Sequence, residues 1–473
     1  PVSDGPERLL QRGEEEGMVM PVALEAPFVH RFAIPDHRQR GVGSAAFDRE
    51  DERHGGKVAA GPQGRQGRAI LPCAFSLLSL SSLRGVRLPG VPQFFKIMTE
   101  YAKGLEGVIA NETALSNVDG KLGQLSYLGY PIDELVEKCR YEEIIYLLHY
   151  GALPKQQELD DFMHALRAER GLPDGVIDFL KNAPKDASPM DVLRTAVSML
   201  CLYDKRTAIG VPDMEKDAAI ALSICAKVPT IVAAYHRFRQ GLELPPMRED
   251  MGEARHFLYL LNGKEETDRA VRTLAVALIL HADHGMNAST FAARVTIAPP
   301  SDMYSAVTSA IGALKGPLHG GANEGVIHML EDIGEVDKVD AYIAGMLERK
   351  EKVMGIGHRV YKTLDPRAPH LRRLAIQLTE ELGEPKWIQM SERIAEIMRE
   401  KKGLEANVDF YSATVYYSLG IPTDLFTPIF AIARTRGWTA QVLEQLRDNR
   451  LYRPQTLWVG PSELLPVTPI EQR

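Results

Sequence analysis

The sequence of this 473-residue chain predicts a mainly α fold with a small N-terminal β hairpin. Apolar residues recur every three or four positions through most of the chain after residue 130, as they do on the buried face of a helix. Strand-like patterns are confined to residues 104–132, and strands and helices do not alternate as they do around a parallel sheet. The length and the 45% share of hydrophobic residues allow two or three domains with a large core.

The first predicted element is the strand-like stretch 104–132, in which Asp119-Gly120 marks a turn between two runs rich in β-forming residues. A helix follows from Pro131, because proline suits the first helical turn. Three predicted helices then begin at residues that are good N-caps: 188–204 at Ser188, 267–285 at Thr267 and 301–316 at Ser301. Gly316 ends the third helix, as a C-cap glycine does. Further helices are predicted over 340–355, 370–383, 386–403 and 427–448.

Two of the predicted helical stretches, 272–282 and 427–433, are apolar on more than one face. A helix of this kind lies either at the centre of a large protein or between subunits. We therefore expect an oligomer.

The composition changes near residue 97. Before this point Gly and Pro make up 21 of 97 residues, against 48 of the remaining 376, and all 16 Tyr follow it. The segment has no sustained helical or strand period, so residues 1–97 are expected to be a disordered or non-native extension, with a fresh start at Met98. A targeting peptide is the alternative, but the run Glu14–Glu16 argues against a transit peptide, which is poor in acidic residues.

Charge and cysteine content narrow the class of protein. The net charge of −7 and the pI of about 6.1 argue against a nucleic-acid-binding surface, which needs an excess of basic residues. The four cysteines, Cys73, Cys139, Cys201 and Cys225, lie far apart, which predicts a reduced cytoplasmic protein without a zinc site. No uninterrupted run of 18 apolar residues is present, so no membrane span is expected.

Two histidine-containing segments are candidate sites. In HADHGMN (281–287), His281 and His284 lie three residues apart on one helical face. Because no carboxylates stand at metal-site spacing, a hydrogen bond from His284 to a substrate oxygen is favoured over a metal, and His281 fits a satisfied buried histidine. The segment GPLHGGANEG (316–325) lacks the lysine and hydroxyl of a phosphate loop. A plain turn and a ligand lying against the glycines beside His319 are equally good interpretations.

The loop MGIGHRVYKTLDPRAP (354–369) combines two glycines with His358, Arg359, Lys362 and Arg367. A solvated basic loop is one interpretation. Since the glycine backbone can touch a ligand and the cations attract an anion, a binding loop is the other.

Three more charged residues stand in apolar surroundings. Asp409 is at or just before the start of the helix in NVDFYSATVYYSLG, where it either offsets the helix dipole or is a desolvated carboxylate able to act as a base. Arg434 lies in an apolar helix and Arg453 in an irregular tail, and each pairs either with an internal acid or with a substrate carboxylate. Together the histidines, Asp409 and the arginines suit acid–base chemistry on a small polycarboxylate.

The segments HADHGMNAST, GPLHGGANEG, MGIGHRVYKTLDPRAP and NVDFYSA resemble, in this order, four motifs of the citrate synthase family, and residues 102–135 are similar to the start of its short bacterial members. The resemblance spans about Ala102 to Pro466. It implies a mainly α homodimer with a citrate-synthase-like two-domain helical fold. Residues 98–318 would form the first part of the large domain, 319–412 the small domain, and 413–473 the return to the large domain and the C-terminal tail.

The resemblance also implies an activity, the condensation of acetyl-CoA with oxaloacetate and the hydrolysis of citryl-CoA to citrate and CoA, as in the tricarboxylic acid cycle. No cofactor or metal would be needed. In the catalytic set, His319 would hydrogen-bond the thioester carbonyl, Asp409 would remove a methyl proton and His358 would polarise the ketone. Oxaloacetate would contact His284, Asn287, Arg367, Arg434 and Arg453, the last shared across the two subunits. CoA would lie along Val353, Met354, Gly355, Ile356 and Gly357.

One departure from the family pattern is Gly285, which stands where many members have Glu; it affects the expected local packing only. Two alternatives stay open. The first is a 2-methylcitrate synthase that takes propionyl-CoA, because pockets that differ by one methyl group discriminate by only about 10–200-fold. The second is a non-catalytic helical dimer that binds CoA esters or acts as a scaffold. Loss of Asp409 or His319 would mark the second alternative, and both are present.

Overall fold

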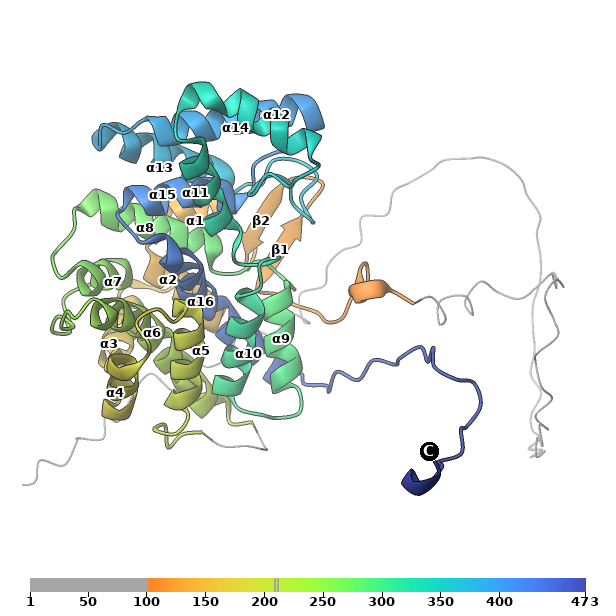
Figure 1. Cartoon of the computed structure of the whole chain (residues 1–473). Coiled ribbons are helices and arrows are strands. Elements are labelled where there is room, and N and C mark those ends of the chain that lie inside the picture. The colour runs from red at the N-terminus through yellow and green to blue at the C-terminus, as the bar shows by residue number, and fades with distance from the viewer. Residues whose placement is uncertain (1–100, 208–209, 211) are drawn as a thin grey trace, which may run out of the picture. The chain divides into compact units, whose positions relative to one another are not determined.

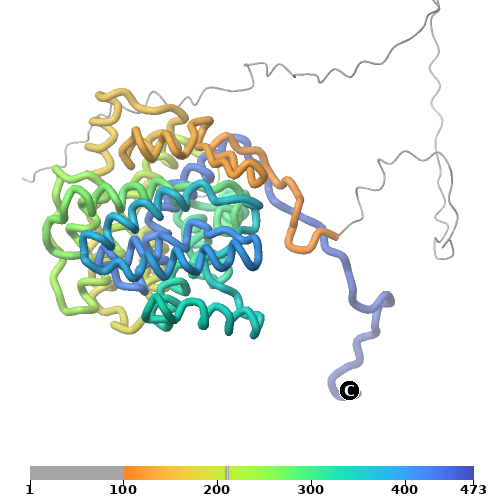
Figure 2. The backbone as a smooth tube through the Cα atoms, turned by 90° about the horizontal axis from the view of Figure 1, so that it is seen from above, coloured from red at the N-terminus to blue at the C-terminus, as the bar shows by residue number. Residues whose placement is uncertain are grey.

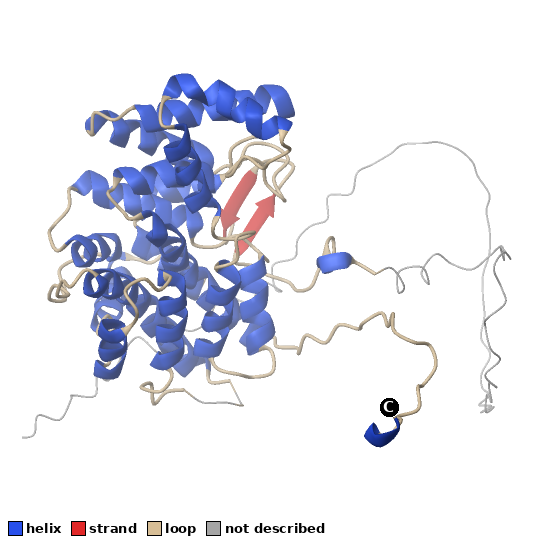
Figure 3. Cartoon of the chain, viewed as in Figure 1, coloured by secondary structure: helices blue, strands red, loops and turns tan. Residues whose placement is uncertain are grey.

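The computed structural model describes residues 101–207, 210 and 212–473, and helices dominate this part of the chain (Figure 1, Figure 3). The prediction of a mainly α fold is confirmed. The predicted extension 1–97 lies outside the described residues. Residues 113–453 belong to one compact unit, and residues 101–112 and 454–473 belong to another. The elements that carry the candidate site all lie in the first of these units.

The predicted β hairpin is present. It consists of β1 (Ser116–Asp119) and β2 (Gln124–Tyr127), which pair antiparallel, and β2 also pairs with the short β3 (Tyr130–Pro131). The predicted strand-like stretch is shorter than expected at its start, where Lys103–Leu105 form a single 3-10 turn. The hairpin turn packs against the loop 358–367, because a Cβ on Gly120 would lie 2.3 Å from the carbonyl oxygen of Val360.

Sixteen α-helices lie within the described residues. In chain order they are α1 (Ile132–Lys138), α2 (Tyr141–Tyr150), α3 (Gln156–Ala168), α4 (Asp174–Asn182), α5 (Pro189–Leu200), α6 (Met214–Arg239), α7 (Glu253–Asn262), α8 (Asp268–His281), α9 (Ala288–Ile297), α10 (Met303–Leu314), α11 (Ala322–Ile333), α12 (Val339–Glu348), α13 (Ala368–Glu381), α14 (Lys386–Lys402), α15 (Val408–Ser418) and α16 (Phe426–Arg447).

Helix α16 is the central element of the core. Of its 22 residues, all except Glu444 and Arg447 are buried. It packs against α2, α5, α6, α8, α9, α10 and α11. Helix α8 is also enclosed, with an unbroken buried run from Thr273 to His281. Packing within one chain therefore accounts for the apolar faces of both helices, and this pattern no longer argues for an oligomer.

Helix α6 was not among the predicted helices, and it contains Pro229 in its interior, where proline removes a backbone hydrogen bond. The helix is 26 residues long and apolar enough, by length and composition, to cross a membrane. However, 83% of its most apolar window is buried by the rest of the chain. It is a core helix, and its burial offsets the cost of the proline.

The helix starts agree with the predicted caps in part. Thr267 is the N-cap of α8, and its hydroxyl accepts a hydrogen bond from the backbone N–H of Ala270, as predicted. The prediction of Ser301 as the N-cap of α10 is wrong, since the side chain of Asp302 accepts the N–H of Ser305 instead. Aspartate caps at least as well as serine, so the two neighbours could not be separated by sequence.

Residues 319–412 contribute α11 to α15, which pack largely on one another, α13 on α15, α11 on α15 and α12 on α14. Figure 1 shows α12, α13 and α14 gathered at one side of the helical body. Helices α13 and α15 both contact α8. In Figure 2 the blue tube of α13 and α15 lies beside the green tube of α8. The site residues described next come from the loops at this junction.

Candidate active site

His319 lies in the short loop between α10 and α11. The loop turns tightly, because the N–H of Gly320 donates to the carbonyl of Leu314 at 3.0 Å and a Cβ on Gly320 would lie 2.6 Å from that same oxygen. His319 Nε2 is 2.8 Å from the hydroxyl of Ser289 at the start of α9. Trp438 of α16 donates its indole N–H to that hydroxyl at 3.1 Å. The imidazole is therefore held in place by two core helices.

The hydroxyl of Ser289 has one hydrogen and two acceptors in reach. Its oxygen is 2.7 Å from Asn287 Oδ1 and 2.8 Å from His319 Nε2. If the hydrogen points to His319, the neutral ring carries its own proton on Nδ1. Burial, helped by the charge of Arg434, lowers the pKa of His319 to about 4. The ring is therefore neutral at pH 7 and can donate one hydrogen bond.

His284 and His358 lie close together with Tyr361. The ring centroids of His284 and His358 are 5.4 Å apart, and His284 Nε2 is 3.0 Å from the hydroxyl of Tyr361. His284 is in the loop between α8 and α9, and burial, together with Arg367 and Arg434, holds its pKa well below the ordinary value. Two segments separated by more than 70 residues are thereby brought to one place.

The tautomer of His358 follows from its contacts. Its Nδ1 accepts hydrogen bonds from the backbone N–H groups of Val360 at 3.0 Å and Tyr361 at 3.1 Å. Burial first and Arg367 second lower the pKa of His358 to about 4, so the ring is neutral at pH 7. With Nδ1 acting as the acceptor, the proton resides on Nε2. His358 therefore presents an Nε2–H donor.

Arg367 forms a buried ion pair with Asp365. Its Nε and Nη2 donate to the two carboxylate oxygens at 2.9 and 2.8 Å. Both side chains are nearly inaccessible, and Asp365 also accepts the N–H of Val408, the first residue of α15. The pair keeps the cation in the interior and leaves Nη1 outside the bidentate contact.

Asp409 lies in the first turn of α15, but it does not cap the helix. The side chain of Asn407 caps it instead, accepting the N–H of Asp409 at 2.9 Å. The residue as a whole is partly exposed, yet its Oδ1 is inaccessible and has no hydrogen-bond partner among the described residues. Burial raises the pKa of Asp409 to about 7, against the opposing charge of Arg367. The carboxyl group can therefore exist in either protonation state near pH 7.

Arg434 projects from the middle of α16. Its Nε donates to the carbonyl of His281 at 2.8 Å, and its guanidinium lies 4.8 Å from the centre of the Phe430 ring. No carboxylate of the described chain forms an ion pair with it, and complete burial lowers its pKa to about 10. A buried arginine whose terminal nitrogens lack partners can bind an anionic ligand.

The other predicted binding residues occupy different positions. Asn287 caps α9, its Oδ1 accepting the N–H groups of Ser289 and Thr290. Arg453 is exposed on the segment after α16 and contacts no side chain of the candidate site within this chain. The other singled-out histidine, His281, is fully buried as predicted, but it is satisfied only at Nδ1, which lies 2.7 Å from the carbonyl of Ala277, since its Nε2 has no hydrogen-bond partner among the described residues.

The loop Val353–Gly357 is joined to the segment before Asp409. The N–H of Gly357 donates to the backbone carbonyl of Glu405 at 2.7 Å. Asn407 donates its backbone N–H to the carbonyl of Gly355 and its side-chain N–H to the carbonyl of Gly357. Gly355 has a packing role, since a Cβ there would lie 2.9 Å from Cα of Phe410 and its φ is +71°. A Cβ on Gly357 would have room, since its nearest neighbour would be the side chain of Leu404 at 3.8 Å.

Two cavities on the described part of the chain lie away from these loops. One has a volume of about 530 Å³ and is lined in part by Arg206, Asp213 and Pro300. The other, of about 490 Å³, is lined in part by Trp387 and Tyr417. None of the predicted site residues lines either cavity, so neither contributes to the candidate site.

Comparisons with known proteins agree with this geometry. A family model described as the C-terminal domain of citrate synthase matches residues 104–455. Citrate synthase 2 of Bacillus subtilis is 51% identical over 372 residues, which cover 78% of this chain and 99% of that protein.

The chain belongs to the citrate synthase family.

Other members of the citrate synthase family are similar as well. The 2-methylcitrate synthase 1 of Corynebacterium glutamicum is 40% identical over 380 residues, covering 79% of this chain and 99% of that protein. Among solved structures, the citrate synthase of Thermoplasma acidophilum, in a ternary complex with carboxymethyl coenzyme A and oxaloacetate, matches with a TM-score of 0.74 and 33% identity, over 79% of this chain and 100% of that one. The chain is an enzyme of this family, and its all-α fold agrees with that of the solved members.

Sequence reasoning within the citrate synthase motifs missed four residues that hold the site together. They are Tyr361, Asp365, Ser289 and Trp438. Tyr361 and Asp365 stand inside the motif 354–369, and an aspartate two residues before a buried arginine is a signal that could have been used. Ser289 also stands inside a motif, HADHGMNAST (281–290), whereas Trp438 is brought to it only by the fold. Gly285, the departure from the family pattern, has a φ of +56°, which favours glycine. A Cβ there would meet only Val118, at 3.6 Å, so the glycine is not required by a close contact.

Proposed function

We propose that this chain condenses acetyl-CoA with oxaloacetate and hydrolyses the resulting citryl-CoA to citrate and CoA, as in the tricarboxylic acid cycle. The observation that carries the proposal is the grouping of neutral His319, neutral His358 and a carboxyl group, Asp409, whose pKa is raised to about 7, next to the buried cations Arg367 and Arg434. No metal or cofactor is needed for any step.

The first step is enolisation of the thioester. In its ionised form Asp409 removes a proton from the acetyl methyl group. A carboxylate cannot do this efficiently alone, because the methyl proton is weakly acidic. His319 is neutral, and with the Ser289 hydroxyl donating to its Nε2 it carries its proton on Nδ1 and donates Nδ1–H to the carbonyl oxygen as negative charge develops there. A donor at a developing oxyanion contributes about 100–1,000-fold to the rate.

The second step forms the carbon–carbon bond. His358 donates Nε2–H to the ketone oxygen of oxaloacetate and draws charge away from the carbon under attack. Its Nδ1 is fixed by two backbone N–H groups, so the donor direction is set before substrate binds. His284 and Asn287 contact oxaloacetate in this scheme, and Arg367 and Arg434 hold its carboxylates.

The third element of the proposal concerns assembly. Arg453 is exposed and has no ion-pair partner among the described residues, which supports a homodimer in which Arg453 of each subunit reaches the oxaloacetate site of the other. The loop Val353–Gly357 lies along CoA. Residues 319–412 act as a small domain that closes on the large domain, 98–318 and 413–473, and excludes water before hydrolysis.

We also propose that the enzyme works in the reducing cytoplasm. Cys139, Cys201 and Cys225 are all free thiols among the described residues. No disulfide within this part of the chain therefore requires an oxidising compartment.

The test is release of CoA thiol, followed with a thiol reagent. With acetyl-CoA and oxaloacetate together, we expect thiol release and citrate by mass spectrometry; with either substrate alone, we expect none. The absence of thiol release from every acyl-CoA tried would leave the non-catalytic CoA-ester-binding or scaffold dimer as the better interpretation.

A second candidate is favoured by one specific finding, the 40% identity to a 2-methylcitrate synthase. The two reactions share every catalytic group and differ by one methyl group in the acyl pocket. The ratio of kcat/KM for acetyl-CoA to that for propionyl-CoA decides between them. A ratio above one supports citrate synthesis, and a ratio below one supports 2-methylcitrate synthesis.

A further inference from the structure

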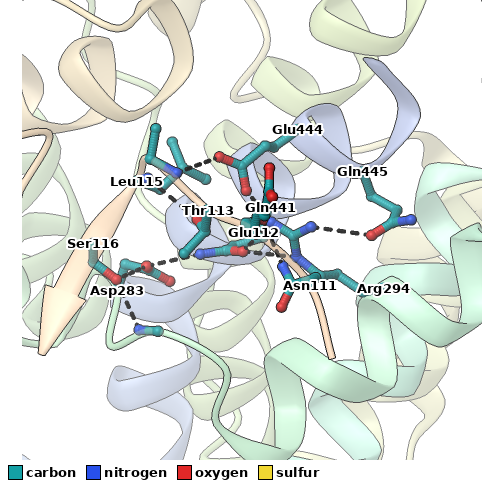
Figure 4. A network of polar contacts seen from close by, with 12 residues as sticks. Asn111, Glu112, Thr113, Leu115, Ser116, Asp283, Arg294, Gln441, Glu444 and Gln445 are labelled. Carbon is teal, nitrogen blue, oxygen red and sulfur yellow. Dashed lines mark hydrogen bonds and ion pairs between the residues drawn. The ribbon is translucent and has the colours of Figure 1, made fainter. Parts of the chain in front are cut away.

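The hydroxyl of Ser116 bridges the two residues that flank His284 in sequence. Ser116 is buried on β1, and it donates to Asp283 Oδ2 at 2.5 Å while accepting the backbone N–H of Gly285 at 2.8 Å. Figure 4 shows Ser116 facing Asp283 from the strand, with the dashed contacts that meet at the hydroxyl. One side chain of the hairpin thus binds the residues on both sides of His284.

The direction of these hydrogen bonds follows from the network behind Asp283. Arg294 has only donors, so Gln441 must turn its Oε1 toward it, where the Nε of Arg294 donates at 2.8 Å. The Nε2 of Gln441 then faces Asp283 Oδ2 and donates at 3.0 Å. Asp283 Oδ2 is therefore an acceptor, and the hydroxyl of Ser116 supplies its second donor (Figure 4). The lone pairs of the hydroxyl remain for Gly285.

The backbone around His284 is also held by Asn287, whose side chain donates to the carbonyls of His284 and Gly285 and whose backbone N–H donates to Gly285. Helix α8 ends at His281, the segment 282–287 is not helical, and Gly285 adopts the left-handed φ of +56°. The hydroxyl of Tyr127 binds the carbonyl of Asp283, on the side away from Gly285. Among the described residues, Ser116 is the one acceptor of the Gly285 N–H. Removing it leaves the N–H of Gly285 without an acceptor, a loss that the contacts of Tyr127 and Asn287 do not replace.

We propose that Ser116 is a positioning residue for oxaloacetate recognition, acting through Asp283 and Gly285 on the orientation of His284. The proposal rests on the proposed function, in which His284 contacts oxaloacetate. The contacts of the hairpin turn with the loop 358–367, those of Gly120 with Val360 and Lys362 and of Gly123 with Thr363, do not involve Ser116. The effect of Ser116 therefore falls on oxaloacetate rather than on the acyl-CoA.

The experiment compares Ser116→Ala with Ser126→Ala. Ser126 is on the neighbouring strand β2, is partly buried and makes no side-chain hydrogen bond among the described residues, so it is a matched control. We expect the KM for oxaloacetate to rise about 10-fold in Ser116→Ala, equivalent to about 1.4 kcal/mol, which is the range of one buried hydrogen bond. The KM for acetyl-CoA stays within about two-fold, since its contacts are unchanged. Ser116→Thr, which retains the hydroxyl, returns the KM for oxaloacetate toward that of the unsubstituted chain.

Two failures can be told apart. If the unsubstituted chain releases no thiol, the proposed function is wrong. If it does, and Ser116→Ala and Ser126→Ala have the same KM for oxaloacetate, the positioning role of Ser116 is overturned. An equal rise in the KM for both substrates also overturns it, because that result indicates a general loss of structure. Circular dichroism checks folding, and Ser116→Cys, nearly equal in size with a weakly bonding thiol, replaces Ser116→Ala if that variant does not fold.

Discussion

Replacing Asp409 by asparagine should remove the base and, at the same time, make the fold more stable than that of the unsubstituted chain at neutral pH. Asp409 Oδ1 is inaccessible and has no hydrogen-bond partner among the described residues, and burial raises the pKa of the carboxyl group from 3.8 to about 7. This difference of about three pH units corresponds to at most about 4 kcal/mol between the charged and neutral forms. Asparagine is never charged, so the variant escapes this cost.

The sign of the pH dependence follows from linkage. The folded state retains the proton up to about pH 7, whereas the unfolded chain releases it near pH 4. The unsubstituted chain therefore loses stability between about pH 4 and pH 7, and it loses no more from this group above pH 7. The free energy of unfolding of Asp409→Asn should exceed that of the unsubstituted chain by an amount that grows by about 2–3 kcal/mol between pH 5 and pH 8.

Urea unfolding at pH 5, 6, 7 and 8 measures this difference, and thiol release measures turnover in the same preparations. We expect kcat to fall roughly 10²–10⁴-fold, the usual contribution of a general base. Asp178→Asn, on an exposed face of α4, is the control, and it should change neither quantity. A stability difference that is constant across these pH values would refute the argument that the carboxyl group is desolvated, and near-normal turnover would refute its role as the base.

Three further predictions concern groups that hold the site. Ser289→Ala should lower kcat roughly 10-fold while leaving the KM for oxaloacetate within about two-fold, because His319 loses the partner that sets its tautomer; steady-state kinetics measures both. Asp365→Ala should lower the free energy of unfolding by about 3–5 kcal/mol, because Arg367 is left buried without its partner; urea unfolding measures it. Gly355→Ala should lower the melting temperature, because its positive φ and the 2.9 Å approach to α15 exclude a Cβ; calorimetry measures it.

Each of these predictions has an outcome that contradicts it. A Ser289→Ala enzyme with full kcat means that His319 needs no partner. An Asp365→Ala chain as stable as the original means that solvent or another group neutralises Arg367. For the glycine, Gly357→Ala is the matched control: it has a positive φ but an open Cβ position, so it should cost less stability than Gly355→Ala. Equal melting temperatures for the two variants would contradict the packing argument.

The periodicity of apolar residues was enough to predict the helical class, because a long helix with one apolar face is buried along that face in any tertiary structure. It failed where one local rule conflicted with burial. No helix was predicted over 214–239, where Pro229 removes one backbone hydrogen bond, yet the core that surrounds α6 outweighs that loss. Similarly, Ser301 and Asp302 are both good caps, and only the backbone geometry selects the second.

The candidate site was predictable as a set of residues but not as a set of contacts. His319, His358 and Asp409 were found because reactive side chains beside glycines or in apolar surroundings are unusual. Their partners are ordinary residues brought in by the fold. Ser289 stands in the segment HADHGMNAST, but it lies 30 positions from His319 and nothing in the sequence marks it as the partner of that residue. The same holds for Ser116, which is separated from Asp283 by 167 positions.

Asn407 joins two parts of the molecule that are proposed to act on opposite ends of the same acyl-CoA. It donates to the carbonyls of Gly355 and Gly357, and it accepts the N–H of Asp409. The hydrogen bonds of Asn407 thus connect the backbone of residues 355–357, proposed to bind CoA, to the start of the helix that carries Asp409, proposed to deprotonate the acyl group. An engineer who reshapes residues 355–357 for a bulkier thioester will also re-aim the carboxyl group, so selections for new acyl donors should recover paired changes on both sides of Asn407.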